Sequence, residues 1–347
     1  MIERFSVPFS SPLSTAAGAI SERQGFLVGY DHRGVTGLGE ATPLPGWTEA
    51  IEECERALEA ALAAGAGGAH SEALLTMDAD RVPAARHGFA TALLDADARA
   101  DGVPLYRWFD GARRVDSVPV NATVGDGNRE ETVVAARAAV EAGFDCLKCK
   151  VGARDVDADV ERIRAVREAI GGDVAIRLDA NGAWDRETAR RALDAFEPLK
   201  VAYVEQPLPA GEIDGLADLR ERSVGVGVAV DETLVDHRLA DVLDAGAADV
   251  LMLKPMVLGG PGTAHTVATR ARELGVDPVV TTTIDTVVAR TAAVHVAAAI
   301  PDVRPCGLAT ADLLAEDIGP DPAPVANGRI AVPQDPGLGL DHAEVTP

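Results

Sequence analysis

Short apolar runs rich in β-branched residues alternate with longer stretches of 3.6-residue periodicity from about residue 118 to residue 318. The short runs predict buried strands, and the longer stretches predict amphipathic helices. One such helix carries Val160, Ile163, Val166 and Ile170 on a single apolar stripe. This alternation is typical of successive βα units around a parallel sheet. Strands are expected over eight segments: 118–124, 146–151, 174–179, 201–205, 226–231, 250–254, 278–283 and 303–308.

Polar residues end five consecutive predicted strands, each one βα unit after the last. They are Lys150, Asp179, Glu205, Asp231 and Lys254. Eight βα units close most economically into a barrel, whose chemistry lies at the C-terminal ends of its strands. A doubly wound open sheet is the alternative, but it would not gather consecutive strand ends around one centre, and no G-x-G-x-x-G follows the first strand. We therefore expect an α/β fold with a parallel barrel.

The N-terminal part of the chain has a different pattern. Segments 24–31 and 35–41 alternate as a hairpin around His32-Arg33-Gly34, and helical stretches are expected around 48–64 and 83–101. This part is predicted to be α+β. After about residue 318 the chain is rich in proline, glycine and aspartate, which predicts an extended segment.

Charge narrows the classes of partner. The chain has 32 lysines and arginines against 55 aspartates and glutamates, a net charge of −23, which opposes binding to nucleic acid or anionic membranes. Only four of the basic residues are lysines, and this acidic, lysine-poor surface suggests a salt-adapted protein. No apolar run could span a bilayer and no secretory signal is visible at the start, so we expect a cytoplasmic location.

The four cysteines include a C-x-x-C pair, Cys146 and Cys149. These two lie on a predicted strand, where residues three apart point to opposite faces, and no second cysteine or histidine pair has zinc spacing. We therefore expect all four cysteines to be reduced, buried, apolar fillers.

Asp179, Glu205 and Asp231 end three consecutive strands in the same register. Carboxylate oxygens are the ligands that Mg²⁺ prefers, with Mn²⁺ also possible, and three carboxylates without a cation would repel one another. The pattern predicts a metal site. Asn181 and Glu232 adjoin two of these ligands and fit an outer shell that orients them, although ordinary turn and helix-start roles are equally open.

Lys148 and Lys150 are two apart on one strand, so both side chains face the barrel interior. Neighbouring ammonium groups beside a metal ion lower each other's pKa, which suits a general base. Lys254 approaches from the far side, and this arrangement suits proton abstraction next to a carboxylate. Arg177 shares the face of Asp179, and a buried arginine requires an anionic partner: Glu205, another acid or the substrate.

These segments resemble the enolase superfamily, and within it the muconate-lactonizing subgroup. The resemblance rests on Lys148-Cys149-Lys150, Arg177-Leu178-Asp179-Ala180-Asn181, Val204-Glu205-Gln206-Pro207, Val230-Asp231-Glu232, Leu253-Lys254-Pro255 and the N-terminal segment 37–47. It implies a (β/α)₇β TIM-like barrel (113–318) under an N-terminal α+β capping domain (1–112), with residues 319–347 packing back toward the capping domain. It also implies Mg²⁺ on Asp179, Glu205 and Asp231, with Lys150 and Lys254 as acid/base residues.

Within that subgroup the chain is most similar to the o-succinylbenzoate synthase family of menaquinone biosynthesis. The resemblance implies that Lys150 removes the proton α to a carboxylate, gives a metal-stabilised enediolate and then protonates the departing hydroxyl, while Lys254 stabilises charge. It places Thr283 and Gly307 on the succinyl carboxylate and Thr15 in a capping loop that closes over the site. The chain departs from the family at Asp285, where glutamate is usual, and at Ala309, where aspartate is usual.

Two alternatives stay open. A racemase or epimerase on the same scaffold could use Lys150 and Lys254 on opposite sides of one carbon. Segment 307–309 lacks the Asp-x-Asp of dipeptide epimerases, which leaves an N-succinylamino acid racemase open. Mandelate racemase chemistry is disfavoured, since His265 and His295 fall within predicted helices.

A non-catalytic metal-binding barrel is a remote alternative. The expected partner is a small-molecule carboxylate, and the sequence does not reveal the oligomeric state.

Overall fold

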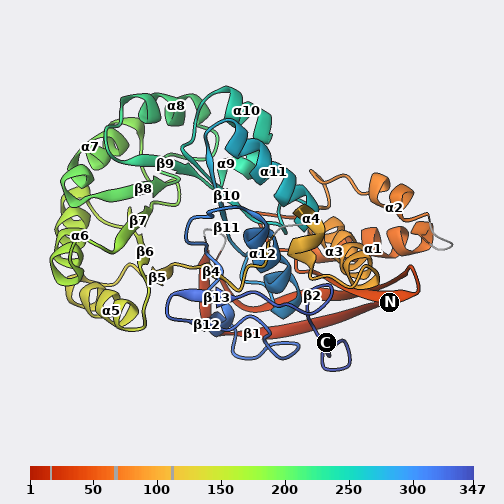
Figure 1. The fold of residues 1–347 in the computed structure, drawn as a ribbon. Coiled ribbons are helices and arrows are strands. Elements are labelled where there is room, and N and C mark those ends of the chain that lie inside the picture. The colour runs from red at the N-terminus through yellow and green to blue at the C-terminus, as the bar shows by residue number, and fades with distance from the viewer. Residues whose placement is uncertain (16–17, 66–68, 111–112) are drawn as a thin grey trace.

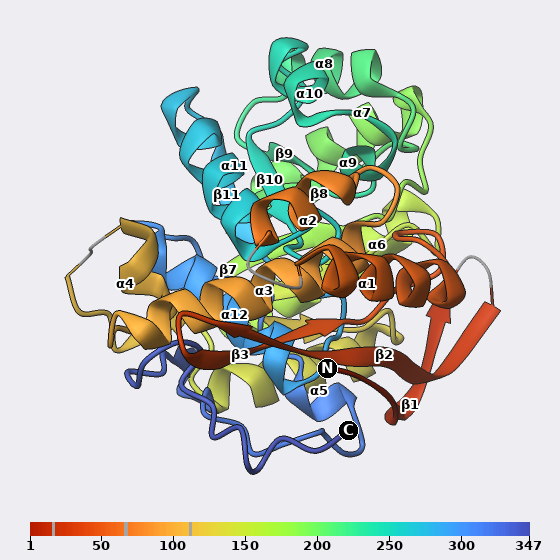
Figure 2. The ribbon, with the colours of Figure 1, turned by 90° about the vertical axis from the view of Figure 1, so that its right-hand side faces the viewer.

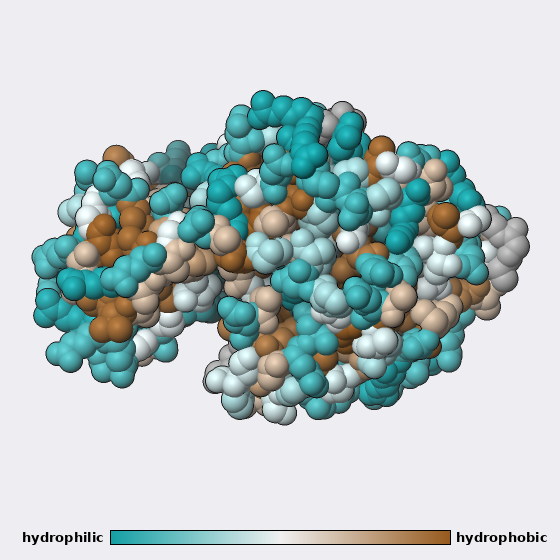
Figure 3. All heavy atoms as spheres, turned by 60° about the horizontal axis from the view of Figure 1, so that its bottom comes forward, coloured by the Kyte–Doolittle hydropathy of each residue, from teal (hydrophilic) through white to brown (hydrophobic). Residues whose placement is uncertain are grey.

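A curled parallel sheet and an antiparallel domain beside it make up the structure (Figure 1). It is a computed structural model that describes residues 1–15, 18–65, 69–110 and 113–347. The expected fold class, a TIM-like barrel with an N-terminal α+β domain, is confirmed. Within the described ranges, no helix is long and apolar enough to cross a membrane. Hydrophilic residues cover most of the face in Figure 3, and the apolar residues on this face form several separate groups.

The N-terminal domain is an antiparallel sheet in the order β1-β2-β3, with helices over one face (Figure 2). The hairpin closes with His32 opposite Val35, as the alternation predicts. The first strand is missing from the prediction, although Phe5, Val7 and Phe9 are buried at alternate positions. The elements are β1 (Ile2–Thr15), β2 (Gly18–His32), β3 (Val35–Ala41), α1 (Ile51–Gly65), α2 (His70–Thr76), α3 (Pro83–Ala100) and α4 (Leu105–Asp110).

Glycines let α3 lie directly on β3. A Cβ atom at Gly39 would stand 1.9 Å from the Gly88 carbonyl oxygen, and one at Gly37 would stand 2.0 Å from the Ala92 carbonyl oxygen. No side chain fits in that space, so these positions fix how closely the helix approaches the sheet.

The barrel sheet has seven parallel strands in sequence order, with helices on its outside. Its strands are β5 (Ala122–Val124), β6 (Cys146–Lys150), β7 (Ala175–Asp179), β8 (Val201–Glu205), β9 (Gly227–Val230), β10 (Val250–Leu253) and β11 (Asp277–Val280). Its helices are α5 (Arg129–Glu141), α6 (Val156–Ile170), α7 (Arg186–Phe196), α8 (Ile213–Arg222), α9 (Thr233–Asp236), α10 (Leu239–Asp244), α11 (Pro261–Glu273) and α12 (Val287–Ala299).

The two expected strands at the seam of the barrel differ from prediction. Segment 118–124 is divided, because β4 (Ser117–Pro119) turns outward to pair with β13 (Arg329–Ala331), which also pairs with β12 (Val325–Ala326). Segment 303–308 closes the barrel only through isolated bridges, Val120 to Cys306 and Thr281 to Gly307. Pro305 has no N–H for a ladder hydrogen bond, which shortens this last strand.

The last part of the chain lies against the N-terminal domain. Leu338, Leu340 and Val345 are buried in one cluster with residues of β1 and β2. The buried Asp95 carboxylate of α3 accepts hydrogen bonds from the N–H groups of Leu38 and Leu338, at 2.9 and 2.7 Å. The tail therefore shares a hydrophobic core and a polar anchor with the N-terminal sheet.

One buried carboxylate joins the N-terminal domain to the barrel. Glu40 of β3 accepts hydrogen bonds from the Thr286 N–H at 2.9 Å, the Thr286 hydroxyl at 2.7 Å and the Ala289 N–H at 2.8 Å. It therefore caps α12, a helix of the other domain, and satisfies N–H groups that a helix start leaves unpaired. Burial and the nearby Asp285 raise the pKa of Glu40 to about 7, although the hydrogen bonds from Thr286, Thr42 and Ala289 lower it.

This pKa predicts a pH-dependent contribution to stability. Because the folded-state pKa lies above the unfolded value of 4.5, Glu40 stabilises the fold most in acid, and this contribution is lost as pH rises from about 4.5 through 7. The difference in unfolding free energy between the parent and Glu40→Gln should fall by about 3 kcal/mol over that range. Chemical denaturation at several pH values measures it, with Glu59→Gln at an exposed position of α1 as the matched variant. A difference that does not change with pH would contradict the prediction.

Candidate active site

Carboxylates and lysines gather where five adjacent strands end. Asp179 and Glu205 are the last residues of β7 and β8, and Asp231 directly follows β9. Lys150 ends β6 in register with Asp179, which is in register with Glu205. Lys254 follows β10. Charged residues that are one βα unit apart in sequence therefore lie side by side, because parallel strands bring their carboxyl ends to the same edge of the sheet.

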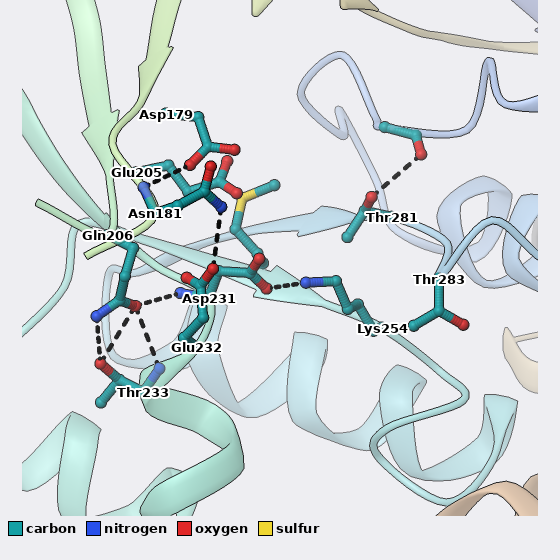
Figure 4. A network of polar contacts seen from close by, with 12 residues as sticks. Asp179, Asn181, Glu205, Gln206, Asp231, Glu232, Thr233, Lys254, Thr281 and Thr283 are labelled. Atoms are coloured by element: carbon teal, nitrogen blue, oxygen red, sulfur yellow. Dashed lines mark hydrogen bonds and ion pairs between the residues drawn. The ribbon is translucent and has the colours of Figure 1, made fainter. Parts of the chain in front are cut away.

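The lysines pair with the carboxylates. Lys148 Nζ lies 2.7 Å from Glu205 Oε1 and 2.9 Å from Asp179 Oδ2, and Lys150 Nζ lies 2.7 Å from Asp179 Oδ2. On the other side, Lys254 Nζ binds Asp231 Oδ1. Figure 4 shows the carboxylates of Asp179, Glu205 and Asp231 on one side of the Lys254 side chain, with Thr281 and Thr283 on the other.

Burial and crowding set the pKa values of this cluster. Burial and the neighbouring Asp179 raise the pKa of Glu205 to about 8, against the effect of Lys148. Burial alone would raise the pKa of Asp179, but Lys148 and Lys150 outweigh it and hold that pKa below its usual value. For Lys148, burial lowers the pKa, yet Glu205, Asp179 and Asp231 together raise it well above normal. For Lys148 this direction is opposite to the lowering that we expected beside a metal ion, because the surrounding carboxylates together outweigh its burial.

Asn181 and Glu232 are hydrogen-bonded to each other beside the charged cluster. Asn181 accepts a hydrogen bond from Lys150 Nζ at 2.7 Å and donates one from its Nδ2 to Glu232 Oε1 at 3.0 Å. Burial and Asp231 raise the pKa of Glu232. Both residues therefore lie where outer-shell groups would lie, joined to each other by a hydrogen bond.

Gln206 is a residue of this site that the sequence analysis did not single out. It is fully buried with φ of +42°, and its side-chain oxygen accepts hydrogen bonds from the N–H groups of Asp231 at 3.0 Å and Thr233 at 3.2 Å. Its amide also donates to the Leu208 carbonyl oxygen at 2.8 Å. Gln206 thus fixes the loop after β8 to the loop after β9, which holds Glu205 and Asp231 at a constant spacing.

The donor set suits a hard divalent cation. Oε2 of Glu205 is buried and has no hydrogen-bond partner among the described residues, an arrangement that costs free energy unless a cation completes it. As the side chains stand, no three histidine, cysteine or acidic residues of the described ranges converge on one point as ligands. Lys148 pairs with Asp179 and Glu205, and Lys254 pairs with Asp231. The residues therefore fit Mg²⁺, with ligation requiring the carboxylates to turn from the lysines.

Arg177 points into the barrel, as the two-residue period of a strand predicts. It is 3% exposed and donates from Nη1 to the Pro305 carbonyl oxygen at 2.5 Å, and its guanidinium carbon lies 5.0 Å from the centre of the Tyr203 ring. No carboxylate in the described part of the chain forms an ion pair with it within 4.0 Å, and Glu205, one of the partners left open by the sequence, pairs with Lys148 instead. A backbone carbonyl and an aromatic face replace the anion.

Thr283 and Gly307, expected on a substrate carboxylate, have their donors engaged. The Thr283 hydroxyl and N–H both donate to Asp285, and the Gly307 N–H donates to the Val280 carbonyl oxygen at 2.9 Å. A threonine hydroxyl has a single proton to donate. Thr15 ends β1, but its side chain and residues 16 and 17 lie outside the described structure.

Trp47 brings the N-terminal domain into the site. Lys254 Nζ lies 3.6 Å from the centre of the Trp47 ring, a cation–π contact between the barrel and the loop after β3. Sequence reasoning missed this role because nothing in a local pattern tells which lysine an aromatic residue will cover. Two smaller expectations are confirmed: His265 and His295 lie in helices α11 and α12, and the four cysteines are buried and free.

A barrel with acidic ligand candidates at its strand ends and lysines on both sides defines a class of enzymes, and comparisons with known proteins place the chain in it. The family model described as "Enolase C-terminal domain-like" matches residues 131–345, and "MenC, N-terminal domain" matches residues 1–96. The chain belongs to the enolase superfamily.

Individual relatives differ in their reactions. An o-succinylbenzoate synthase of Thermobifida fusca is 41% identical over 62% of this chain and 67% of the relative, and an L-Lys-D/L-Arg epimerase of Methylococcus capsulatus is 32% identical over 97% and 96%. The N-succinyl Arg/Lys racemase structure from Bacillus cereus has a TM-score of 0.87 at 26% identity, covering 98% of this chain and 94% of that one. A dipeptide epimerase of Enterococcus faecalis, solved with Mg and a dipeptide, has a TM-score of 0.85 at 25% identity, covering 99% and 98%.

The ion pairs of Lys148 predict a stability effect. In metal-free protein, Lys148→Met should lower the unfolding free energy by about 3 kcal/mol, because it leaves Asp179 and Glu205 buried with one counter-ion fewer. Added Mg²⁺ should recover part of this loss. Lys200→Met is the control, because Lys200 is an exposed lysine outside the cluster, and it should change stability by less than about 0.5 kcal/mol. Equal effects of both variants in denaturant titrations would show that the pairing contributes nothing.

Proposed function

We propose that this chain catalyses the Mg²⁺-dependent syn elimination of water from the cyclohexadiene precursor of o-succinylbenzoate, in menaquinone biosynthesis. The observation that carries the proposal is the placement of Lys150 and Lys254 on β6 and after β10, on opposite sides of the three strands that lead to Asp179, Glu205 and Asp231. Similarity to the Thermobifida fusca enzyme and the MenC N-terminal match support this substrate.

Lys150 is the proposed base. Its amine, once turned from Asp179 and Asn181, takes the proton α to the substrate carboxylate, and the electron pair of the C–H bond moves onto that carboxylate to give an enediolate. That electron pair then forms the C=C bond as the C–O bond breaks. The same ammonium group returns that proton to the leaving hydroxyl, so water departs from the face on which the proton was removed. Mg²⁺ held by Asp179, Glu205 and Asp231 would supply positive charge beside the substrate carboxylate.

Lys254 is proposed to act through its charge. Asp231 and the Trp47 ring both stabilise a cation at this position. A cation there can stabilise negative charge that develops on the substrate without exchanging a proton. Elimination needs one base, whereas racemisation needs Lys254 to gain and lose protons as well.

The second candidate is racemisation of N-succinylamino acids. Two lysines facing each other across the site could each exchange the α-proton, and the similarity in fold to the N-succinyl Arg/Lys racemase supports it. The deciding experiment follows dehydration of the cyclohexadiene precursor by absorbance, beside deuterium exchange at the α-carbon of N-succinylamino acids, both with Mg²⁺ and high salt. Dehydration with little exchange assigns the lyase, whereas exchange without dehydration assigns the racemase.

Loss of the base should remove turnover without unfolding the protein. We expect Lys150→Ala to lower kcat for dehydration by about 10²- to 10⁴-fold, because a general base contributes that much. Lys200→Ala is the matched lysine control and should keep full activity. A Lys150→Ala enzyme within about tenfold of the parent would show that another group removes the proton.

Metal dependence can be measured separately. Exhaustive chelation should abolish dehydration, and Mg²⁺ should restore it in the parent but not in Asp231→Asn, which lacks one anionic ligand. Isothermal titration with Mg²⁺ should show correspondingly weaker binding to Asp231→Asn. Activity that survives chelation would overturn the metal assignment.

A further inference from the structure

A buried ion pair lies at the joint between the N-terminal domain and the barrel. Arg23 of β2 and Asp285, after β11, have side chains 2% and 4% exposed, and Arg23 Nη2 lies 3.6 Å from Asp285 Oδ1. Neither residue takes part in the proposed chemistry. A buried pair of this kind has a large desolvation cost, so its retention calls for a structural or functional reason.

Arg23 fixes three segments at once. Besides Asp285, its guanidinium donates to the carbonyl oxygens of Ile284 at 3.2 Å, Thr42 at 2.7 Å and Pro43 at 3.0 Å. A rigid, planar fork of N–H donors is the only side chain that can make these bonds together. The strand that carries Arg23, the loop after β3 and the loop after β11 therefore have one common anchor.

Both anchored loops lead to Lys254. The loop after β3 continues from Thr42 and Pro43 through a turn, closed by the Trp47 N–H on the Leu44 carbonyl oxygen, to the Trp47 ring over Lys254. The loop after β11 carries Thr283, drawn on the far side of Lys254 from the carboxylates in Figure 4. Arg23 thus sets the spacing of two walls of the site from one buried point.

Asp285 connects Arg23 to Thr283, because its carboxylate contacts both residues. Its carboxylate accepts the Thr283 N–H at 3.1 Å and the Thr283 hydroxyl, while Ile284 between them has φ of +61°. A β-branched residue is strained at that angle and keeps it only where its surroundings impose it. Arg23 imposes it by holding the Ile284 carbonyl oxygen and the Asp285 carboxylate together.

Arg23 does not act as a direct anion site in this arrangement. It lines a cavity of the N-terminal domain, but Glu22, Glu49 and Glu52 line the same cavity and would repel a substrate carboxylate. Its nitrogens are already bound to three carbonyl oxygens and paired with Asp285, and its side chain is 2% exposed. Its influence on a ligand must therefore pass through the loops that it holds.

We propose that Arg23 and Asp285 are positioning residues that set where Trp47 and Thr283 lie around Lys254, and so determine which distal group of a carboxylate substrate fits. This inference rests on the proposed function for its substrate. The distal end of the site is then built jointly by the two domains, and Asp285 makes Thr283 an acceptor rather than a donor toward the ligand.

The test compares Arg23→Met, Arg23→Lys and Asp285→Asn with Asp95→Asn, a buried carboxylate of the same domain that anchors the tail instead. In dehydration assays we expect Arg23→Met and Asp285→Asn to raise KM for the cyclohexadiene precursor at least about tenfold, with kcat within about threefold of the parent. Arg23→Lys should recover part of the KM, and Asp95→Asn should lower thermal stability with KM unchanged. An unchanged KM in Arg23→Met and Asp285→Asn, or a loss confined to kcat, would overturn the proposal.

A second readout does not depend on turnover. In a Trp108→Phe, Trp184→Phe background, Trp47 is the remaining tryptophan. Arg23→Met should make its fluorescence at least about twofold more accessible to acrylamide, whereas Asp95→Asn should not. If Arg23→Met fails to fold, Arg23→Lys and Asp285→Asn give the same comparison. If the parent shows neither dehydration nor exchange, the proposed function fails, and unaltered quenching would independently overturn the positioning role.

Discussion

The structure depends on the compensation of buried negative charge at the mouth of the barrel. Asp179, Glu205 and Asp231 are each 6% exposed or less, and their carboxylates would repel one another in any arrangement that lacked cations. Lys148, Lys150 and Lys254 supply that charge from β6 and β10, which border the acidic strands. Because each lysine binds a candidate metal ligand, the same ion pairs that stabilise the fold also hold the chemical groups in reach of one another.

The N-terminal domain is part of this arrangement rather than a separate unit attached to it. Glu40 caps α12, Arg23 binds the loop after β11, and Trp47 covers Lys254. Separating the domains would break these contacts, including the hydrogen bonds that Glu40 accepts at the start of α12. The position of the N-terminal domain over the barrel is therefore set by specific polar contacts as well as by apolar packing.

A strand end can be recognised in sequence, but the partner of a buried charge cannot. Arg177 shows the difference: its inward direction follows from the two-residue period of a strand, whereas its contact with the Pro305 carbonyl oxygen requires that the eighth segment pass beneath it. The divided first strand is a similar case, because pairing of β4 with β13 depends on a segment more than 200 residues away in sequence.

The sequence by itself determined the barrel, the hairpin around His32-Arg33-Gly34 and the gathering of Lys150, Asp179, Glu205, Asp231 and Lys254 at one edge. These features follow from local periodicity and from the rule that parallel strands share a direction. Only the tertiary structure decided which lysine binds which carboxylate, that Gln206 joins two loops, and that Asp285 occupies the donors of Thr283. Such contacts join residues far apart in the chain, and their geometry depends on packing that no local pattern encodes.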